Sequence, residues 1–333
     1  MIKMSLILPV YNVEKYLEDC LESLLCQDIE ESDYEIICVI DGSTDNSKKI
    51  LEAYLQYHKN IKIFEQHNQG VCVARNVGLN NAIGKYIWFI DPDDIIFSNC
   101  LKTIYETMEQ FEADIFEFDY ITCGEKYHFY PREAEITING RNKDGASGAV
   151  WLAVYKRAYL LENGISFNIK LNYGEDYLWA FQTKYRKHSS IFTRAPLYIY
   201  RKRQGSAMNS LNLEKNKKHM QDMIELYKIY NQEIVRCKED SMGKDVFDNI
   251  KKRQQLCCEA ALICLMKLRL SFKETQEQLL KWEKEGIYPY KLMLWNIFGK
   301  NTIHPFKLRM ITFLFPVKKY FLLICYIYQK IRR

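Results

Sequence analysis

The 333-residue chain has no uninterrupted run of about 18 apolar residues, the length that a membrane-spanning helix requires. Its first residues also lack the charged-then-apolar pattern of a secretory signal peptide, and residues 5–10 are typical of a short strand instead. No pair among the 11 cysteines has CxxC spacing, which leaves buried, reduced thiols as the simplest interpretation. These absences predict a cytoplasmic protein.

Two common nucleotide-binding motifs are absent as well. No GxGxxG follows the first predicted strand, which disfavours a nicotinamide-dependent dehydrogenase. No GxxxxGK[ST] occurs either, which disfavours a P-loop ATPase.

Acidic residues are missing from residues 286–333, although this segment contains nine Lys or Arg. The net charge of the chain is +5, so the preceding residues together carry −4. Residues 306–333 combine basic with aromatic and aliphatic side chains, a pattern typical of a segment that lies on an anionic membrane surface. A helix packed on its own domain or on a second subunit is the alternative. Nucleic-acid binding is disfavoured because the segment is too apolar and no reader motif occurs.

The first hundred residues alternate between strand and helix patterns. Apolar strand patterns occur at residues 4–11, 34–41, 61–66 and 85–90, and helical periodicity occurs at 13–25, 47–57 and 71–83. Asn12 is the expected cap of the first helix. This alternation predicts an α/β fold with a mostly parallel sheet and helices on both faces, in which ligands bind at the carboxyl ends of the strands.

The rest of the chain divides into further segments. Residues 122–140 are predicted to form a hairpin, and residues 174–187 a helix whose first turn holds Glu175 and Asp176, where acidic side chains are favourable. Long helical patterns begin after about residue 211. We therefore predict an α/β domain over 1–210, a helical region over 211–305 and a basic amphipathic tail over 306–333.

The fourth strand pattern runs directly into three carboxylates, Asp91, Asp93 and Asp94. Alternation along an extended segment would aim Asp91 and Asp93 the same way, and such close like charges require a cation. Mg²⁺ and Mn²⁺ usually take only one or two carboxylates and complete their shell with water and phosphate oxygens. An Asp-x-Asp at a sheet edge therefore indicates a bound metal–diphosphate, with a solvated acidic turn as the alternative.

Four segments, taken in order, carry a resemblance to a known family. They are "SLILPVYNVEKYLEDCLESLLCQ", "YEIICVIDGSTDNS", "NQGVCVARNVGLNNAIGKYIWFIDPDD" and "YGEDYLWA". Over residues 4–206 the chain resembles the family 2 glycosyltransferases, which are inverting enzymes with the Rossmann-like GT-A fold. The resemblance implies a nucleotide-sugar donor, with a UDP-sugar favoured.

The resemblance assigns the donor to residues that follow the first strands. Pro9, Tyr11 and Asn12 would line the base and ribose pocket, and Asp41 would contact the uracil edge. Ile40 precedes Asp41 where many members have a second acid. Further positions that match the family's nucleotide-binding residues are Gly70 and Arg75. A salt bridge from Arg75 to Asp91 or Asp93 is the alternative role.

The remaining matches concern the metal and the chemistry. Asp91 would lie near the ribose and Asp93 would hold Mn²⁺ or Mg²⁺, while Asp94 would act directly or orient neighbouring backbone groups. Asp176 would be the general base for the acceptor hydroxyl, and Glu175 would shape the pocket.

The segment "RKRQGSAMNS" resembles the part of the family that closes over the diphosphate. Arg201, Arg203 and Ser206 would bind phosphate, or would belong to a solvated basic loop. Gln204 stands where relatives often have a histidine, which leaves a third protein ligand of the metal open.

The function that the resemblance implies is metal-dependent, inverting transfer of a sugar to an acceptor hydroxyl. The expected acceptor is a saccharide or a lipid-linked saccharide, in bacterial surface-polysaccharide or glycolipid synthesis at the inner face of the cell membrane. A catalytically silent subunit that binds a nucleotide-sugar or a lipid carrier is the alternative.

Overall fold

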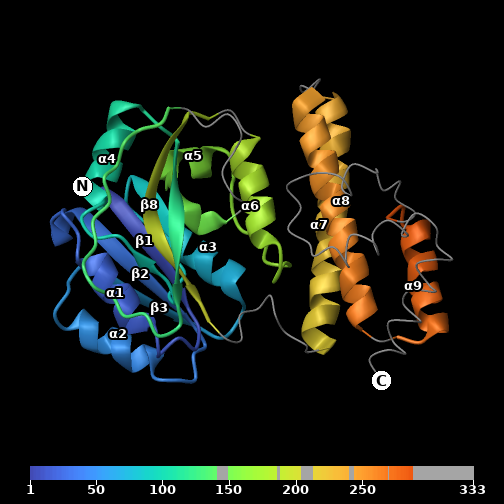
Figure 1. Ribbon diagram of the computed structural model, residues 1–333, viewed down its shortest axis with the longest axis horizontal. Helices are drawn as coiled ribbons and strands as arrows, with labels where there is room; N and C mark the ends of the chain where they lie inside the picture. The colour runs from blue at the N-terminus through green and yellow to red at the C-terminus, as the bar shows by residue number, and fades with distance from the viewer. Residues whose placement is uncertain (141–148, 186–187, 204–212, 240–243, 269, 288–333) are drawn as a thin grey trace. The chain divides into compact units, whose positions relative to one another are not determined.

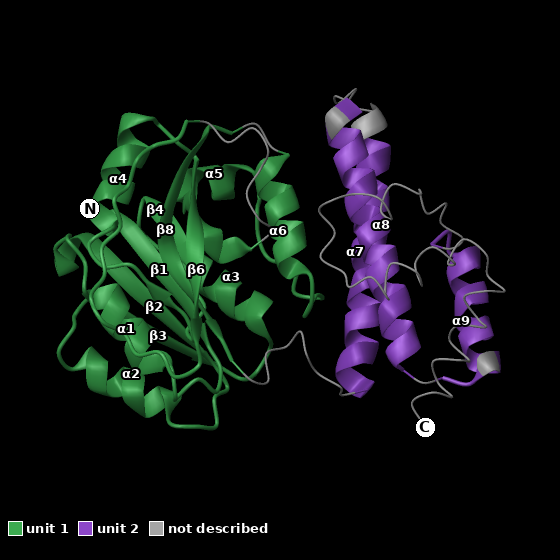
Figure 2. Ribbon diagram, viewed as in Figure 1, with its two compact units in different colours: residues 1–206 green, residues 207–333 purple. Residues whose placement is uncertain are grey.

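The computed structural model describes residues 1–140, 149–185, 188–203, 213–239, 244–268 and 270–287. The chain divides into two compact units, residues 1–206 and residues 207–333 (Figure 2). The predicted boundary at 210 falls within residues 204–212, and the predicted tail over 306–333 falls within residues 288–333. Both lie outside the described residues, so the division into three parts stays a prediction.

The first unit is built on one mixed sheet of eight strands in the order β3-β2-β1-β4-β7-β6-β8-β5 (Figure 1). The strands are β1 Met4–Val10, β2 Tyr34–Asp41, β3 Ile61–Gln66, β4 Tyr86–Phe89, β5 Ile95–Ile96, β6 Ile115–Gly124, β7 Ala153–Lys156 and β8 Ser190–Lys202.

The sheet combines a parallel half with a mixed half. The pairs β1–β2, β1–β4 and β2–β3 are parallel, as the alternation of strand and helix predicted. Beyond β4, the pairs β4–β7, β6–β7 and β5–β8 are antiparallel, and β6–β8 is parallel. The carboxyl ends of β1, β2, β3 and β4 therefore meet at one edge of the sheet.

Helices cover both faces of this sheet (Figure 1). They are α1 Leu17–Leu25, α2 Ser47–Leu55, α3 Val71–Asn81, α4 Leu101–Gln110, α5 Arg157–Glu162 and α6 Glu175–Lys184, with short 3₁₀ turns η1 Glu31–Asp33 and η2 Val150–Leu152. Strands β1, β2 and β4 are buried along their whole length, which is why their sequences are apolar runs without alternation.

Two local predictions are wrong. Helix α1 begins at Leu17 after Tyr16, not after Asn12, which instead has a positive φ of 50° and accepts a hydrogen bond from the backbone N of Thr44. The hairpin predicted at residues 122–140 does not form. Strand β6 ends at Gly124 and pairs with β7 and β8, and only an isolated bridge from Ile138 to Thr193 follows it in this fully described segment.

The second unit contains three helices among its described residues, α7 Leu213–Glu239, α8 Lys244–Lys267 and α9 Phe272–Lys284. Helix α7 packs on α8. Ser271 caps α9 in a capping box with Glu274, and buried Trp282 anchors that helix. Within the part of the chain that the structure describes, no helix combines the length and the apolar character needed to cross a bilayer.

Candidate active site

The edge formed by the carboxyl ends of β1 to β4 holds most of the residues that the sequence analysis selected. Pro9 is buried at the end of β1, and Tyr11 follows it with its side chain 48% exposed. Asn12 adjoins them and joins this loop to the loop after β2 through its bond to Thr44. Polar and aromatic groups are thus accessible beside the ends of β1 and β2.

Asp41 at the end of β2 shapes the neighbouring turn. Its Oδ1 accepts hydrogen bonds from Gln66 Nε2 and Gln69 N, both at 2.7 Å, and its Oδ2 accepts one from Gly70 N at 2.8 Å. Gly70, the residue directly before α3, has a φ of 92°, a backbone conformation that residues with a Cβ rarely adopt. The carboxylate therefore fixes the start of α3, and contact of Asp41 with a base stays a prediction.

The acidic motif forms a tight turn, not an extended segment. Asp94 N donates to Asp91 O at 3.0 Å, which closes a turn over residues 91–94. Asp91 Oδ1 lies 2.9 Å from Arg75 Nη2, whereas Asp93 Oδ2 lies 2.5 Å from Arg203 Nε. The extended segment that we assumed for Asp91 and Asp93 is replaced by this turn, and the two carboxylates contact different arginines.

Arg75 joins the acidic turn to the first turn of α6. Besides Asp91, its guanidinium contacts Glu175 Oε1 at 3.3 Å and Asp176 Oδ1 at 3.2 Å. The side chain is only 3% exposed and lies over the ring of Phe167 at 5.2 Å. We call Arg75, Asp91, Glu175 and Asp176 the Arg75 cluster. It brings together motifs about 100 residues apart in the sequence.

The Arg75 cluster holds more negative than positive charge in a confined space. Burial raises the pKa of Glu175 above its usual range, against the opposing effect of Arg75. Burial and the charge of Glu175 together raise the pKa of Asp176 to about 8, although Arg75 opposes this. A carboxylate with a pKa near neutrality is suited to accept a proton.

Asp93 fits a divalent cation. Burial and the nearby charge of Asp91 raise the pKa of Asp93, and the Arg203 guanidinium opposes this rise. The described residues contain no group of three or more His, Cys, Asp or Glu side chains arranged to hold a metal. A single carboxylate plus phosphate oxygens is nevertheless a normal set for Mg²⁺ or Mn²⁺. The salt bridge to Arg75 that we considered for Asp91 or Asp93 is confirmed for Asp91.

Asp94 stabilises the acidic turn by accepting hydrogen bonds from β8. Its Oδ1 accepts a hydrogen bond from Arg201 N at 2.7 Å, and its Oδ2 accepts one from Tyr198 Oη at 2.8 Å. Tyr198 Oη also accepts a bond from Asp91 N at 3.1 Å. Burial raises the pKa of Asp94 to about 9. Asp94 thus orients backbone groups, which is one of the two roles that we had considered for it.

Arg201 is a structural residue that the sequence analysis placed wrongly. Its side chain is 1% exposed and donates to Asp93 O at 2.9 Å, to Asp19 Oδ2 at 3.0 Å and to the carbonyl of Tyr127. It is neither solvated nor available to phosphate. The sequence did contain a signal for this burial: Arg201 lies two residues after apolar Ile199 and so on the same face of β8. A charge at such an inward position needs buried partners.

Arg203 lies at the acidic turn, with its side chain 33% exposed. Its guanidinium lies over the ring of Tyr16, 5.7 Å from the ring centroid, and it also contacts Asp93. Gln204 and Ser206 lie outside the described residues, so their expected places near the diphosphate stay predictions.

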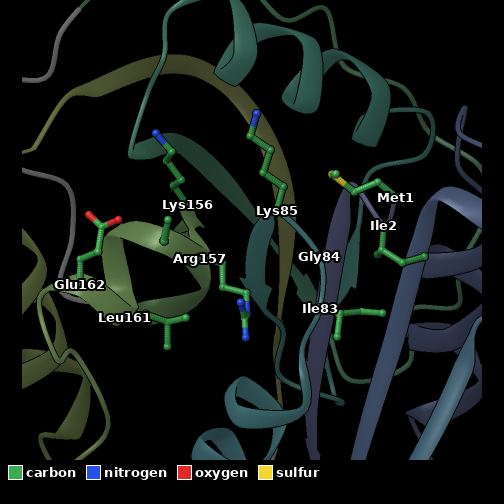
Figure 3. Close-up of a pocket in the computed structure, with 10 residues that line it drawn as sticks. Met1, Ile2, Ile83, Gly84, Lys85, Lys156, Arg157, Leu161 and Glu162 are labelled. Atoms are coloured by element: carbon green, nitrogen blue, oxygen red, sulfur yellow. The ribbon is translucent and has the colours of Figure 1, made fainter.

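A cavity of about 400 Å³ opens at the opposite edge of the sheet (Figure 3). Its lining includes Ile2, before β1, and Ile83, Lys85 and Arg157, which border the paired ends of β4 and β7. Because these are the amino ends of β1 and β4, the cavity lies across the sheet from the Arg75 cluster. It is not the donor site predicted from the sequence.

Comparison with known proteins bears on this arrangement. Residues 5–165 match the family model described as "Glycosyl transferase family 2". Glycosyltransferase GlyA of Streptococcus pneumoniae is 34% identical over 222 residues, which cover 61% of this chain and 31% of that protein. The poly(ribitol-phosphate) beta-glucosyltransferase of Bacillus spizizenii is 30% identical over 220 residues, covering 62% of this chain and 33% of that protein. The chain thus spans about a third of the length of these two relatives.

Solved structures agree on the fold. A crystal structure of S. aureus TarS 1-349 in complex with UDP-GlcNAc matches with a TM-score of 0.61 and 20% identity, over 99% of this chain and 92% of that one. The GT-A fold predicted from the four sequence segments is therefore confirmed. The amino-terminal unit therefore contains a glycosyl transferase family 2 domain, matched over residues 5–165.

Proposed function

We propose that this chain is a metal-dependent, inverting glycosyltransferase that moves a sugar from a UDP-sugar to an acceptor hydroxyl. The observation that supports this proposal most directly is the Arg75 cluster. It joins Asp91, beside the expected metal ligand, to Asp176, the expected base, at the edge where α/β sheets bind nucleotides. The TarS neighbour that was solved with UDP-GlcNAc supports a UDP-linked donor.

In this proposal Asp176 accepts the proton of the acceptor hydroxyl while its oxygen attacks the anomeric carbon. The bond from that carbon to the diphosphate breaks on the opposite face, so a single displacement inverts the centre, and no second carboxylate is needed as a nucleophile. Arg75 keeps Asp176 in place through its 3.2 Å contact and offsets the charge of Asp91 and Glu175. Arg203, which contacts Asp93 in this structure, would bind the diphosphate.

Asp93 would hold the divalent ion. When bound, Mg²⁺ or Mn²⁺ supplies positive charge that stabilises the departing diphosphate.

The acceptor that we propose is a saccharide or lipid-linked saccharide of a bacterial surface polymer. The relative that acts on poly(ribitol-phosphate) supports a surface-polymer acceptor, although that polymer is a polyol phosphate and not a saccharide. We also propose that residues 306–333 hold the protein at the inner surface of the membrane. Replacing Lys318, Lys319 and Lys330 by Gln in the full chain should then weaken binding to anionic vesicles, and unchanged binding would remove the tail as the anchor.

Release of nucleoside diphosphate tests the proposal. The protein is incubated with Mn²⁺ and a panel of nucleotide-sugars, and free UDP is measured. Asp93→Ala should abolish the Mn²⁺-dependent release of UDP, and Asp176→Asn should keep donor binding while lowering transfer by about 10²-fold or more. Full turnover in Asp176→Asn would exclude it as the base. A wild-type protein that binds UDP-sugars but turns over none would favour the silent binding subunit.

A further inference from the structure

Four aromatic side chains gather beside the acidic turn, on one face of β6 and β8. Trp151 of η2 stacks on Tyr198, with 4.3 Å between ring centroids and an interplanar angle of 18°, and on Tyr200 at 5.6 Å and 12°. Tyr120 of β6 meets Trp151 edge-on at 5.2 Å and 84°. We call these four residues the aromatic platform.

The aromatic platform extends from the main core to the surface. Tyr198 is 0% and Trp151 8% exposed within the main core cluster, and Tyr200 packs against that cluster. Tyr120 is 45% exposed, so its ring is the part of the platform that a ligand can reach.

Hydrogen bonds connect the aromatic platform to the active site. Tyr198 Oη contacts Asp91 N and Asp94 Oδ2, so one platform residue directly supports the acidic turn. The carbonyl of Trp151 accepts a bond of 2.9 Å from Trp88 Nε1 on β4, the strand that leads into this turn. Helix α6, which carries Asp176, packs on η2. The platform therefore adjoins both the metal motif and the element that bears the base.

Strand order places the aromatic platform on the acceptor side. The residues expected to bind the base, which precede or follow the ends of β1 and β2, are distant in strand order from the platform on β6 and β8, which lies beyond β4 in the order β2-β1-β4-β7-β6-β8. An inverting displacement needs the acceptor opposite the leaving diphosphate.

We propose that the aromatic platform is an acceptor subsite that stacks against a pyranose ring, with Tyr120 as its exposed contact. This inference rests on the proposed function. A pyranose presents a flat face of C–H groups that packs on an aromatic ring, and its hydroxyls can bond to a tyrosine Oη. An open-chain polyol has no such face. The platform therefore selects a saccharide ring over a polyol phosphate as the group bound next to the reacting hydroxyl.

Replacement of Tyr120 tests this subsite. Transfer is measured onto a panel of methyl pyranosides and onto ribitol 5-phosphate, with the donor KM as the internal reference. Tyr120→Ala should raise the KM for the pyranoside acceptors by about 2- to 10-fold, the range that one aromatic stack contributes. Tyr120→Phe should keep most of the affinity. Tyr57→Ala, at a tyrosine that is 80% exposed just after α2, is the matched control and should change nothing.

A binding measurement tests the subsite independently of turnover. Saturation-transfer NMR records contacts of each methyl pyranoside with the full chain in the presence of UDP, and Tyr120→Ala should remove the ring-proton signals. The subsite is refuted if the alanine variant retains them, if its acceptor KM is unchanged, if ribitol 5-phosphate is affected equally, or if no pyranoside in the panel contacts the wild-type protein. Absence of any UDP-sugar turnover would instead count against the proposed function.

Discussion

Replacing Arg75 by methionine should destabilise the first unit in a manner that depends on pH. Met has similar length and keeps the packing on Phe167, but it removes the positive charge that contacts Asp91, Glu175 and Asp176. Those carboxylates then stay in a confined space without a counter-charge. Removing one partner of a buried ion pair costs about 3–5 kcal/mol. For a unit of this size, roughly 2–4 °C per kcal/mol gives a fall in Tm of about 6–20 °C.

The sign of the pH effect follows from the raised pKa values of the carboxyl groups. In the folded wild-type protein the pKa of Asp176 is about 8, well above its unfolded value. A raised acid pKa means that stability falls as pH rises from the unfolded toward the folded pKa. Without Arg75 the pKa values of Glu175 and Asp176 should rise further. The deficit of Arg75→Met should therefore be larger at about pH 8.5 than at about pH 5.5.

Thermal unfolding of the full chain measures this deficit at the two pH values. Arg194→Met, at an exposed arginine on β8, is the matched control and should show a small deficit that does not change with pH. Adding Glu175→Gln to Arg75→Met should recover part of the loss. Equal deficits at both pH values, or a change in Tm of under about 2 °C, would refute the reasoning that Arg75 offsets buried charge.

Further predictions concern the base, the helix packing and the acidic turn. Because the pKa of Asp176 is about 8, the rate of transfer should rise with pH between about 6 and 9, and a flat profile of kcat/KM against pH would contradict its role as base. Gly78→Ala should cost about 1–3 kcal/mol in urea unfolding, because the new Cβ would lie 2.3 Å from Ile7 Cγ2; unchanged stability would mean that α3 can move from β1 freely. Tyr198→Phe should lower stability by about 1–3 kcal/mol, since Asp94 loses a buried donor, and a variant as stable as wild type would show that this bond is dispensable.

The parallel half of the fold was predictable from local patterns. Residues 4–11, 34–41 and 61–66 were expected to be strands, and β1, β2 and β3 lie there. Strands β1 and β2 are buried along their length and appear as largely apolar runs, whereas β3 is a partly buried strand at the edge of the sheet. Pairing beyond β4 was not predictable. Strand β6 pairs in parallel with β8, which lies some 75 residues further along the chain, and no turn chemistry near residue 124 encodes that partner.

The sequence predicted which residues form the site better than it predicted their contacts. Motif matching selected Arg75, Asp91 and Asp176, and these three side chains do meet. The turn at Asp91–Asp94 was missed, because the strand pattern was extended through residues that already reverse the chain. Tyr198 and Arg201 were missed as supports of this turn, since their partners lie about 100 residues earlier and only the folded sheet brings them close.

The irregular pairing of β6 with β8 has a further consequence for how such a protein could change its specificity. The register shifts twice between Glu117 and Tyr120, which bends the far portions of both strands. One face of these portions packs on a separate apolar cluster of Ile95, Phe97 and Ile199, whereas Tyr198 on the other face belongs to the main core. Substitutions at exposed Tyr120 would therefore disturb the core least, so selection could exchange one acceptor for another while the donor-binding half of the domain stays unaltered.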